Sequence, residues 1–252
     1  MFDPQLINII KAAKRVVVFT GAGMSAESGI PTFRDAQTGL WEKYDPAKLA
    51  SAKGYRADKD LVWGWYEWRR MKVMQAQPNA GHYAIAQLAK QIPELTVITQ
   101  NVDDLHERAG SQAVIHLHGS LFQPRCFACA RPYQFETTPL DEPIDGRRLA
   151  PPRCENCHGR IRPGVVWFGE NLPTDEWRQA ETVAKNCDVF FAIGTSGVVM
   201  PAAGLPVIAS KAGATVIKIN PDSMGLETVA NYRLQGKSGD ILTLLIDLCK
   251  DK

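Results

Sequence analysis

The segment GAGMSAESGIPTFRD, residues 21–35, follows the apolar run Val16–Phe19 after a single threonine. Its first residues fit the pattern G-x-G-x-x-G/A, in which small residues let the backbone approach a pyrophosphate and leave amide N–H groups to bind it. A strand that ends in such a turn is typical of a dinucleotide-binding α/β unit. A tight strand-to-helix turn without a ligand remains an alternative. A redox site would add an acidic residue about 20 positions later at a strand end, whereas this chain has QTGLWEKYD there.

The rest of the chain alternates between strand-like and helical patterns. Nearly continuous apolar strands are typical of a parallel sheet that helices cover on both faces. The sequence therefore predicts an α/β fold, a Rossmann-like doubly wound parallel sheet whose polar strand ends line one crevice. Strand-like runs cover residues 95–101, 113–119, 188–196 and 214–220, and helical patterns cover residues 4–14, 79–91 and 240–252.

Two segments interrupt this alternation and predict a second, smaller lobe. Residues 36–78 are rich in Trp and Tyr and have a helical pattern, and residues 121–163 are rich in Pro, Arg and Cys. We interpret the first as a helical insertion and the second as a zinc-binding insertion. The Rossmann-like domain then consists of residues 1–35, 79–120 and 164–252.

Four of the six cysteines form two C-x-x-C pairs, CFAC and CENC. This spacing fits a closed, structural zinc site in which each pair supplies two thiolates. Reduced cysteines without metal, or two disulfides, remain alternatives. The predicted ligands are Cys126, Cys129, Cys154 and Cys157.

The bulk composition narrows the class of protein. Hydrophobic residues make up 45% of the chain and charged residues 22%, which favours a globular domain over disorder. A net charge of +2 lacks the concentrated basic balance of a dedicated nucleic-acid binder. The N-terminal residues lack the positive charge of a signal peptide, and no apolar run is long enough to span a membrane. We therefore expect a cytoplasmic protein that does not insert into membranes.

Two polar segments follow strands and carry candidate catalytic groups. TQNVDDLH, residues 99–106, places Gln100, Asn101 and Asp103 where a doubly wound sheet presents its ligand groups, although it could also be a capped helix start. In HLHGS, His118 lies beside Gly119 at the strand end and is the better candidate for a general base. A histidine that is merely hydrogen-bonded in the core remains the alternative.

These motifs, together with VVWFGE at 165–170, IGTS at 193–196 and IN at 219–220, resemble the sirtuin family in order and spacing. The resemblance extends from about residue 12 to residue 245. It implies that NAD is a co-substrate cleaved at its nicotinamide bond, which agrees with the missing acidic residue. Residues implied on the NAD side are Gly21, Ala22, Ser25, Phe33, Arg34, Gln100, Asn101, Asp103, Gly194, Thr195, Ser196, Asn220 and Ser238.

The resemblance also implies the reaction and its residues. An acyl-lysine oxygen attacks the ribose as nicotinamide departs, and His118, with Asn101, is catalytic; the products are free lysine, nicotinamide and O-acyl-ADP-ribose. Val166, Gly169 and Glu170 would form an extended edge to which an acylated protein segment adds as a strand. The expected partners are therefore acylated-lysine proteins, and the expected cofactors are NAD and one structural zinc.

Three residues bear on which acyl group the enzyme would remove. Tyr66 and Arg69 are three apart on a predicted helix and share a face, and Ala50 precedes them. This set resembles the sirtuin branch that removes succinyl and malonyl groups, where Ala enlarges the acyl pocket while Tyr and Arg bind the distal carboxylate. We expect a desuccinylase or demalonylase that also removes acetyl groups. An ADP-ribosyltransferase or NAD hydrolase, and a zinc-bearing binding module regulated by NAD, remain alternatives.

Overall fold

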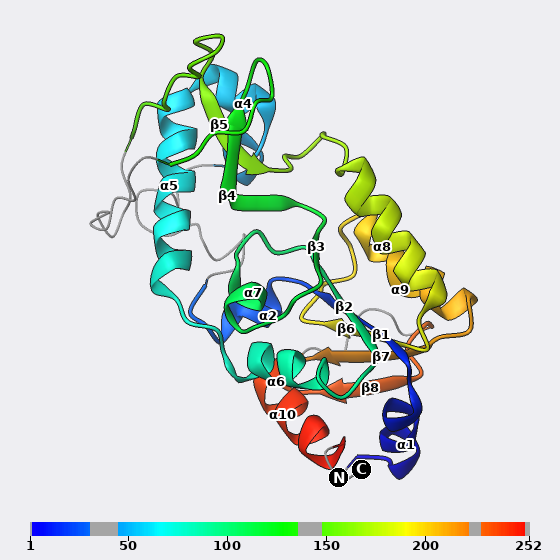
Figure 1. Ribbon diagram of the computed structural model, residues 1–252. Coiled ribbons are helices and arrows are strands. Elements are labelled where there is room, and N and C mark those ends of the chain that lie inside the picture. Colours follow the sequence, from blue (N-terminus) through cyan, green and yellow to red (C-terminus); the bar gives the residue numbers. More distant parts are fainter. Residues whose placement is uncertain (1, 31–44, 136–147, 222–227, 250–252) are drawn as a thin grey trace.

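The computed structural model describes residues 2–30, 45–135, 148–221 and 228–249. Its larger part is a six-stranded sheet in the order β3-β2-β1-β6-β7-β8, in which every neighbouring pair is parallel. The predicted doubly wound α/β fold is therefore confirmed (Figure 1). The strands are β1 (Arg15–Thr20), β2 (Glu94–Thr99), β3 (Val114–His116), β6 (Val189–Ile193), β7 (Thr215–Asn220) and β8 (Tyr232–Gln235).

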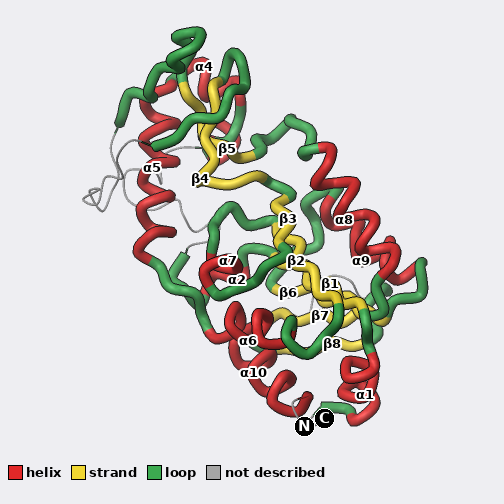
Figure 2. Tube along the Cα trace, viewed as in Figure 1, coloured by secondary structure: helices red, strands yellow, loops and turns green. Residues whose placement is uncertain are grey.

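Two layers of helices cover the sheet, one on each face (Figures 1 and 2). Val16 and Val18 of β1 point into one core with α1, α6 and α10, whereas Val17 and Phe19 point into a second core with α8 and α9. Because alternate residues of a strand face opposite sides, the run RVVVFT supplies both cores at once. The helices are α1 (Pro4–Ala12), α6 (Ala80–Leu88), α8 (Thr174–Asn186), α9 (Leu205–Lys211) and α10 (Ser238–Cys249).

The direction of winding changes between β1 and β6, which are neighbours in the sheet but far apart in the chain. The chain moves from β1 outward to β2 and β3, and then returns to β6 and continues outward to β7 and β8. In open α/β sheets, ligands bind in the crevice beyond the carboxyl ends of the strands at such a point. Thr20 and Ile193, which end these two strands, therefore mark where a site is expected.

A second lobe lies beyond the end of the sheet, at the top of Figure 1. The long helix α5 begins after Asp58, whose carboxylate accepts a hydrogen bond from Leu61 N, and it buries its aromatic side chains. Beside it, β4 and β5 form an antiparallel pair. The lobe contains α3 (Pro46–Leu49), α4 (Ala52–Ala57), α5 (Lys59–Gln75), β4 (Gly119–Cys126) and β5 (Ile161–Val165).

The remaining short elements connect these parts. They are α2 (Gly23–Ala26), α7 (Leu105–Arg108) and the 3-10 turn η2 (Ala202–Gly204). None of the helices in the described ranges has the length and hydrophobicity that a membrane crossing requires.

Candidate active site

A cleft of about 760 Å³ opens beyond the carboxyl ends of β1 and β6 and reaches the second lobe. The two loops that follow these strands contact one another through backbone atoms: Gly21 N donates to Ile193 O at 3.0 Å, and Gly23 N donates to Gly194 O at 2.9 Å. A Cβ atom on Gly194 would lie 2.5 Å from Met24 N, and the φ of Gly194 is +59°. Only glycine fits there, and the contact leaves open backbone at the floor of the cleft.

Most of the sequence-predicted residues come together in this cleft. Ser238 does not line it: its hydroxyl donates to Glu27 Oε1 at the start of α10. Phe33 and Arg34 lie outside the described residues. The predicted residues that line the cleft are Gly21, Ala22, Ser25, Ala50, Tyr66, Arg69, Gln100, Asn101, Asp103, His118, Val166, Gly169, Glu170, Gly194, Thr195, Ser196 and Asn220.

His118 follows β3 and faces the cleft. Its Nδ1 lies 3.0 Å from the Gln100 carbonyl oxygen. Because a carbonyl can only accept, Nδ1 carries the proton, and the neutral ring keeps Nε2 as a free base. Burial lowers the pKa of His118, and the hydrogen bond to Gln100 raises it in part. The side chain is therefore neutral near pH 7 and has the form that a general base needs.

A buried hydrogen-bond network fixes the segment that follows β2. Asn101 Nδ2 donates to Ser25 Oγ at 2.9 Å, and Ser25 Oγ donates to Asp103 Oδ2 at 2.9 Å. Burial raises the pKa of Asp103, while hydrogen bonds from Leu105 N–H and from Ser25 lower it. The amide and carboxylate side chains thus have fixed orientations before any ligand binds, which reduces the cost of binding one.

The neighbouring histidine, His116, has a different environment. Its Nδ1 lies 3.3 Å from the Asn101 carbonyl oxygen, and its Nε2 lies 2.6 Å from Glu107 Oε1. Burial lowers the pKa of His116, but the Glu107 carboxylate offsets this and leaves the pKa above its ordinary value. The two histidines of HLHGS therefore differ in pKa, which is raised in His116 and lowered in His118. Only His118 has the features of a neutral base.

Contacts on the other half of the cleft join the loops after β2, β6 and β7. Gln100 Nε2 donates to Thr195 Oγ1 at 3.0 Å. Asn220 Nδ2, at the end of β7, donates to the Thr195 carbonyl oxygen at 3.2 Å. These bonds place three strand ends along one wall of the cleft, which is where the polar strand ends were expected to meet.

The three predicted acyl-pocket residues lie in the part of the cleft formed by the second lobe. Tyr66 and Arg69 come from α5, and Ala50 lies just after α3. Tyr66 is only 3% exposed, and burial raises its pKa to about 12, so that the hydroxyl keeps its proton at neutral pH. The Arg69 guanidinium lies over the ring of Trp65, at 5.0 Å from its centroid.

The segment after β5 bends instead of continuing as a regular strand. β5 ends at Val165, and the backbone then turns, with Glu170 N donating to Trp167 O at 2.9 Å and Gly169 at a φ of +84°. The Glu170 carboxylate accepts hydrogen bonds from Trp167 N and from Arg162. This ion pair and this turn hold residues 166–170 in a bend beyond the end of β5. The expectation that Val166, Gly169 and Glu170 receive an acylated protein segment stays a prediction.

Two residues that the sequence reasoning missed organise this turn. Arg162 is 4% exposed and binds both oxygens of the Glu170 carboxylate. Trp167 is 1% exposed, and its Nε1 donates to Tyr66 Oη at 3.0 Å. Trp167 belongs to the quoted VVWFGE, but no periodicity in a single sequence could indicate a hydrogen bond to a residue 101 positions earlier.

The four predicted zinc ligands form one cluster at the far end of the β4–β5 pair. Their Sγ atoms all lie within 4.8 Å of one another, with Cys126 Sγ 3.4 Å from Cys157 Sγ and Cys129 Sγ 3.7 Å from Cys154 Sγ. Tetrahedral zinc with bonds of about 2.3 Å separates its sulfurs by about 3.8 Å. The donor set and spacing therefore fit a structural zinc, and the cluster does not line the cleft.

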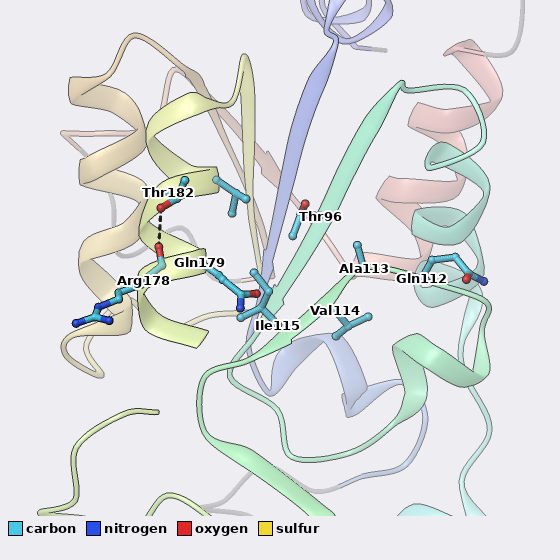
Figure 3. A pocket seen from close by; sticks show the side chains of 9 residues that line it. Thr96, Gln112, Ala113, Val114, Ile115, Arg178, Gln179 and Thr182 are labelled. Carbon is cyan, nitrogen blue, oxygen red and sulfur yellow. Dashed lines mark hydrogen bonds between the residues drawn. The ribbon is translucent and has the colours of Figure 1, made fainter. Parts of the chain in front are cut away.

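A second hollow, of about 500 Å³, lies between the edge strand β3 and α8 (Figure 3). Thr96, Val114 and Thr182 are among the residues that line it, and none of the sequence-predicted site residues does so. Among the described residues that line it, Arg178 is the one ionisable side chain. The cleft at the winding change, in contrast, brings together a histidine, carboxylates and an arginine, so it is the candidate active site.

Comparisons with known proteins agree with this assignment. The model of the Sir2 family matches residues 21–201. An NAD-dependent protein deacylase of Methylococcus capsulatus is 56% identical over 245 residues, which are 97% of this chain and 96% of that protein. NAD-dependent protein deacylase 1 of Archaeoglobus fulgidus is 47% identical over 244 residues, 97% of this chain and 96% of that protein.

Solved structures give the same result. A crystal structure of a Sir2 homologue–NAD complex superposes with a TM-score of 0.91 at 45% identity, over 99% of this chain and 94% of that one. A complex of Sir2 with a p53 peptide and NAD+ superposes with a TM-score of 0.82 at 27% identity, over 98% of each chain. The chain therefore belongs to the Sir2 family.

Proposed function

We propose that this chain is an NAD-dependent protein-lysine deacylase that prefers succinyl and malonyl groups and also removes acetyl groups. The observation that carries the proposal is the presence of Ala50, Tyr66 and Arg69 in the same cleft as His118. A base and a pair of donors for a carboxylate thus share one cavity, with the donors on the second lobe and the base at the sheet.

The NAD side of the proposal rests on the floor of the cleft. The contact between Gly23 and Gly194 leaves a surface of backbone without side chains, and Gly21 and Ala22 line it. Such a surface lets a pyrophosphate approach the backbone closely, whereas the Gly21 and Gly23 N–H groups themselves already donate to Ile193 O and Gly194 O. Asn101 and Asp103, fixed through Ser25, would hold the nicotinamide end, and Thr195 and Asn220 the adenosine end. Cleavage of the nicotinamide bond supplies the electrophilic ribose carbon that accepts the acyl oxygen.

His118 would act as the base in this reaction. Its Nε2 has a free lone pair because Nδ1 donates to the Gln100 carbonyl, so it can take a proton from a ribose hydroxyl. The same hydrogen bond fixes the plane of the ring. The substrate segment would lie against Val166 and Gly169, beside the base, since Val166 N donates to the His118 carbonyl oxygen at 2.9 Å.

The acyl preference follows from the cost of burying a carboxylate. A succinyl or malonyl group carries a negative charge into the cleft, which is unfavourable unless charged or polar donors meet it. Guanidinium binds a carboxylate through two parallel N–H groups, and a tyrosine hydroxyl adds a third donor. The methyl group of Ala50 leaves room at the same wall. An acetyl group needs none of these donors and would still fit.

The test compares one peptide in its acetyl-lysine and succinyl-lysine forms, with products identified by mass. Loss of a charge-assisted contact to a buried carboxylate costs about 2 to 5 kcal/mol. Arg69→Ala should therefore lower kcat/KM for the succinyl peptide by a factor on the order of 30 or more, and for the acetyl peptide much less. Lys72→Ala, on the same helix but outside the cleft lining, is the matched control.

Three results would contradict the proposal. If the wild-type protein has no activity on succinyl-lysine, the proposed acyl preference is wrong. Equal losses on both peptides in Arg69→Ala would assign Arg69 to NAD binding or to stability. ADP-ribosylated protein or free ADP-ribose, in place of O-acyl-ADP-ribose, would identify a transferase or an NAD hydrolase.

A further inference from the structure

The hydroxyl of Tyr66 has a hydrogen-bond partner, Trp167, that is not one of the three predicted acyl-pocket residues. Trp167 Nε1 lies 3.0 Å from Tyr66 Oη, and the two side chains are 1% and 3% exposed. Among the described residues, this is the hydrogen bond that the structure gives the Tyr66 hydroxyl. Trp167 comes from the turn after β5, whereas Tyr66 comes from α5, so the bond joins the turn beside the substrate to the acyl pocket.

The direction of this hydrogen bond is fixed by chemistry. An indole N–H can only donate, so the Tyr66 oxygen is the acceptor. The phenol has a single proton, and that proton is not used on Trp167. It can therefore donate to an acceptor on the open side of the hydroxyl, where Tyr66 lines the cleft. A carboxylate needs such a donor, whereas the methyl end of an acetyl group does not.

The Trp167 ring has a fixed position of its own. The Arg162 guanidinium lies 3.5 Å from the centroid of the Trp167 ring, and the Tyr55 ring centroid lies 5.4 Å away on a tilted plane. Arg162 also binds the Glu170 carboxylate, which in turn accepts a hydrogen bond from Trp167 N. Both the backbone and the ring of Trp167 are held, so the N–H keeps its direction toward Tyr66.

We infer that Trp167 is a positioning residue for acyl selection, because its N–H fixes the Tyr66 hydroxyl so that the phenolic proton donates to a carboxylate on the acyl group. This inference rests on the proposed desuccinylase function. Trp167 also lines the cleft, but in this role it contacts Tyr66 and not the carboxylate. Because it acts through Tyr66, its effect on activity should depend on the presence of the Tyr66 hydroxyl.

The experiment is a double-mutant cycle with Trp167→Phe, Tyr66→Phe and the two together. For each protein, kcat/KM is measured on the acetyl and succinyl forms of one peptide, along with the KM for NAD. A net hydrogen bond is worth about 1 kcal/mol, so Trp167→Phe should lower kcat/KM on succinyl-lysine about fivefold and on acetyl-lysine less than about twofold. In the Tyr66→Phe background, Trp167→Phe should cause no further loss of succinyl activity.

Two additional proteins guard against a packing effect. Benzothienylalanine at position 167 keeps the shape of the ring with sulfur in place of N–H, and should reproduce the Trp167→Phe result. Trp63→Phe is the matched control, because Trp63 is 2% exposed in the same lobe but packs with the zinc cysteines in a different cluster. Trp63→Phe should leave the ratio of succinyl to acetyl activity unchanged.

Equal losses on both peptides in the benzothienylalanine protein, or a Trp167 effect that persists in full without the Tyr66 hydroxyl, would overturn the inference. These outcomes are distinct from failure of the proposed function. If wild type does not act on succinyl-lysine, the proposed function is wrong. If the wild type acts on succinyl-lysine, and Tyr66→Phe lowers that activity while loss of the Trp167 N–H does not, only the role of Trp167 is wrong.

Discussion

We predict that His82 makes the stability of the fold sensitive to mild acid. It is fully buried at the third position of α6, where its Nδ1 accepts a hydrogen bond from Asn79 N, and Asn79 Oδ1 in turn accepts from the backbone N–H of His82. This reciprocal pair is a capping box. Protonation of Nδ1 would place a second donor against the Asn79 N–H group, and the ring of His106 lies 4.9 Å away. Burial lowers the pKa of His82 from 6.5 to about 4.

The size and sign of the effect follow from this shift. Above pH 6.5 the ring is neutral in the folded and unfolded states. As the pH falls from 6.5 to 4, the unfolded chain binds a proton that the folded protein does not, so the free energy of unfolding decreases. A shift from 6.5 to about 4 corresponds to roughly 3 kcal/mol at about 1.4 kcal/mol per unit. Below pH 4 both states carry the proton and this contribution stops changing.

The perturbation that isolates this group is His82→Gln. Glutamine is a preferred residue at this position of a capping box, because its side chain can accept the Asn79 N–H, and it does not titrate. Urea unfolding followed by tryptophan fluorescence, from about pH 7.5 to about pH 4, gives the free energy of unfolding of both proteins. Over that range the wild type should lose roughly 3 kcal/mol more than the variant. Parallel curves would refute the argument, since they would mean that His82 titrates alike in both states.

Two further predictions concern the base and the metal cluster. His118→Ala should lower deacylation by a factor of about 100 or more while NAD still binds, and an active variant would exclude His118 as the base. In the wild type, the activity should fall on the acid side of the pH–rate profile at a pH below 6.5, because burial lowers the pKa of His118. Cys126→Ala should reduce bound zinc, measured by elemental analysis of purified protein, and lower the Tm, because three thiolates do not close the site. Unchanged zinc content would contradict the four-thiolate assignment.

The strands at the centre of the sheet were predictable because they are buried on both faces. β1 and β6 have nearly continuous apolar runs, and β7 is β-branched apart from Lys218 and its last residue, Asn220, which is typical of covered parallel strands. β8 was not predicted, because this edge strand alternates between half-buried and exposed residues and has only four residues. The central strands thus carried a signal in their composition, whereas the edge strand depends on pairing with β7.

The site was predictable where it consists of short motifs, and not where it depends on contacts between motifs. The cleft contains Gly21, His118 and Asn220 because each lies at or just after the end of a strand of one sheet. Ser238 lies outside the cleft lining, where it binds Glu27, and Glu170 lines the cleft but is oriented by Arg162. These partners lie on other elements, so local sequence patterns could not identify them.

The β4–β5 pair connects the thiolate cluster to the cleft, so that binding of a metal at one end and of substrate at the other would affect each other. β4 begins one residue after His118 and ends at Cys126, while β5 leads from the cysteine-containing segment to the turn of Val166 and Trp167. Any free energy by which metal favours the paired strands also favours the arrangement that receives the substrate. By thermodynamic linkage the converse would hold equally, so that a bound substrate would help to retain the metal. An ion held by the four cysteines, away from the cleft, would thereby contribute to substrate affinity.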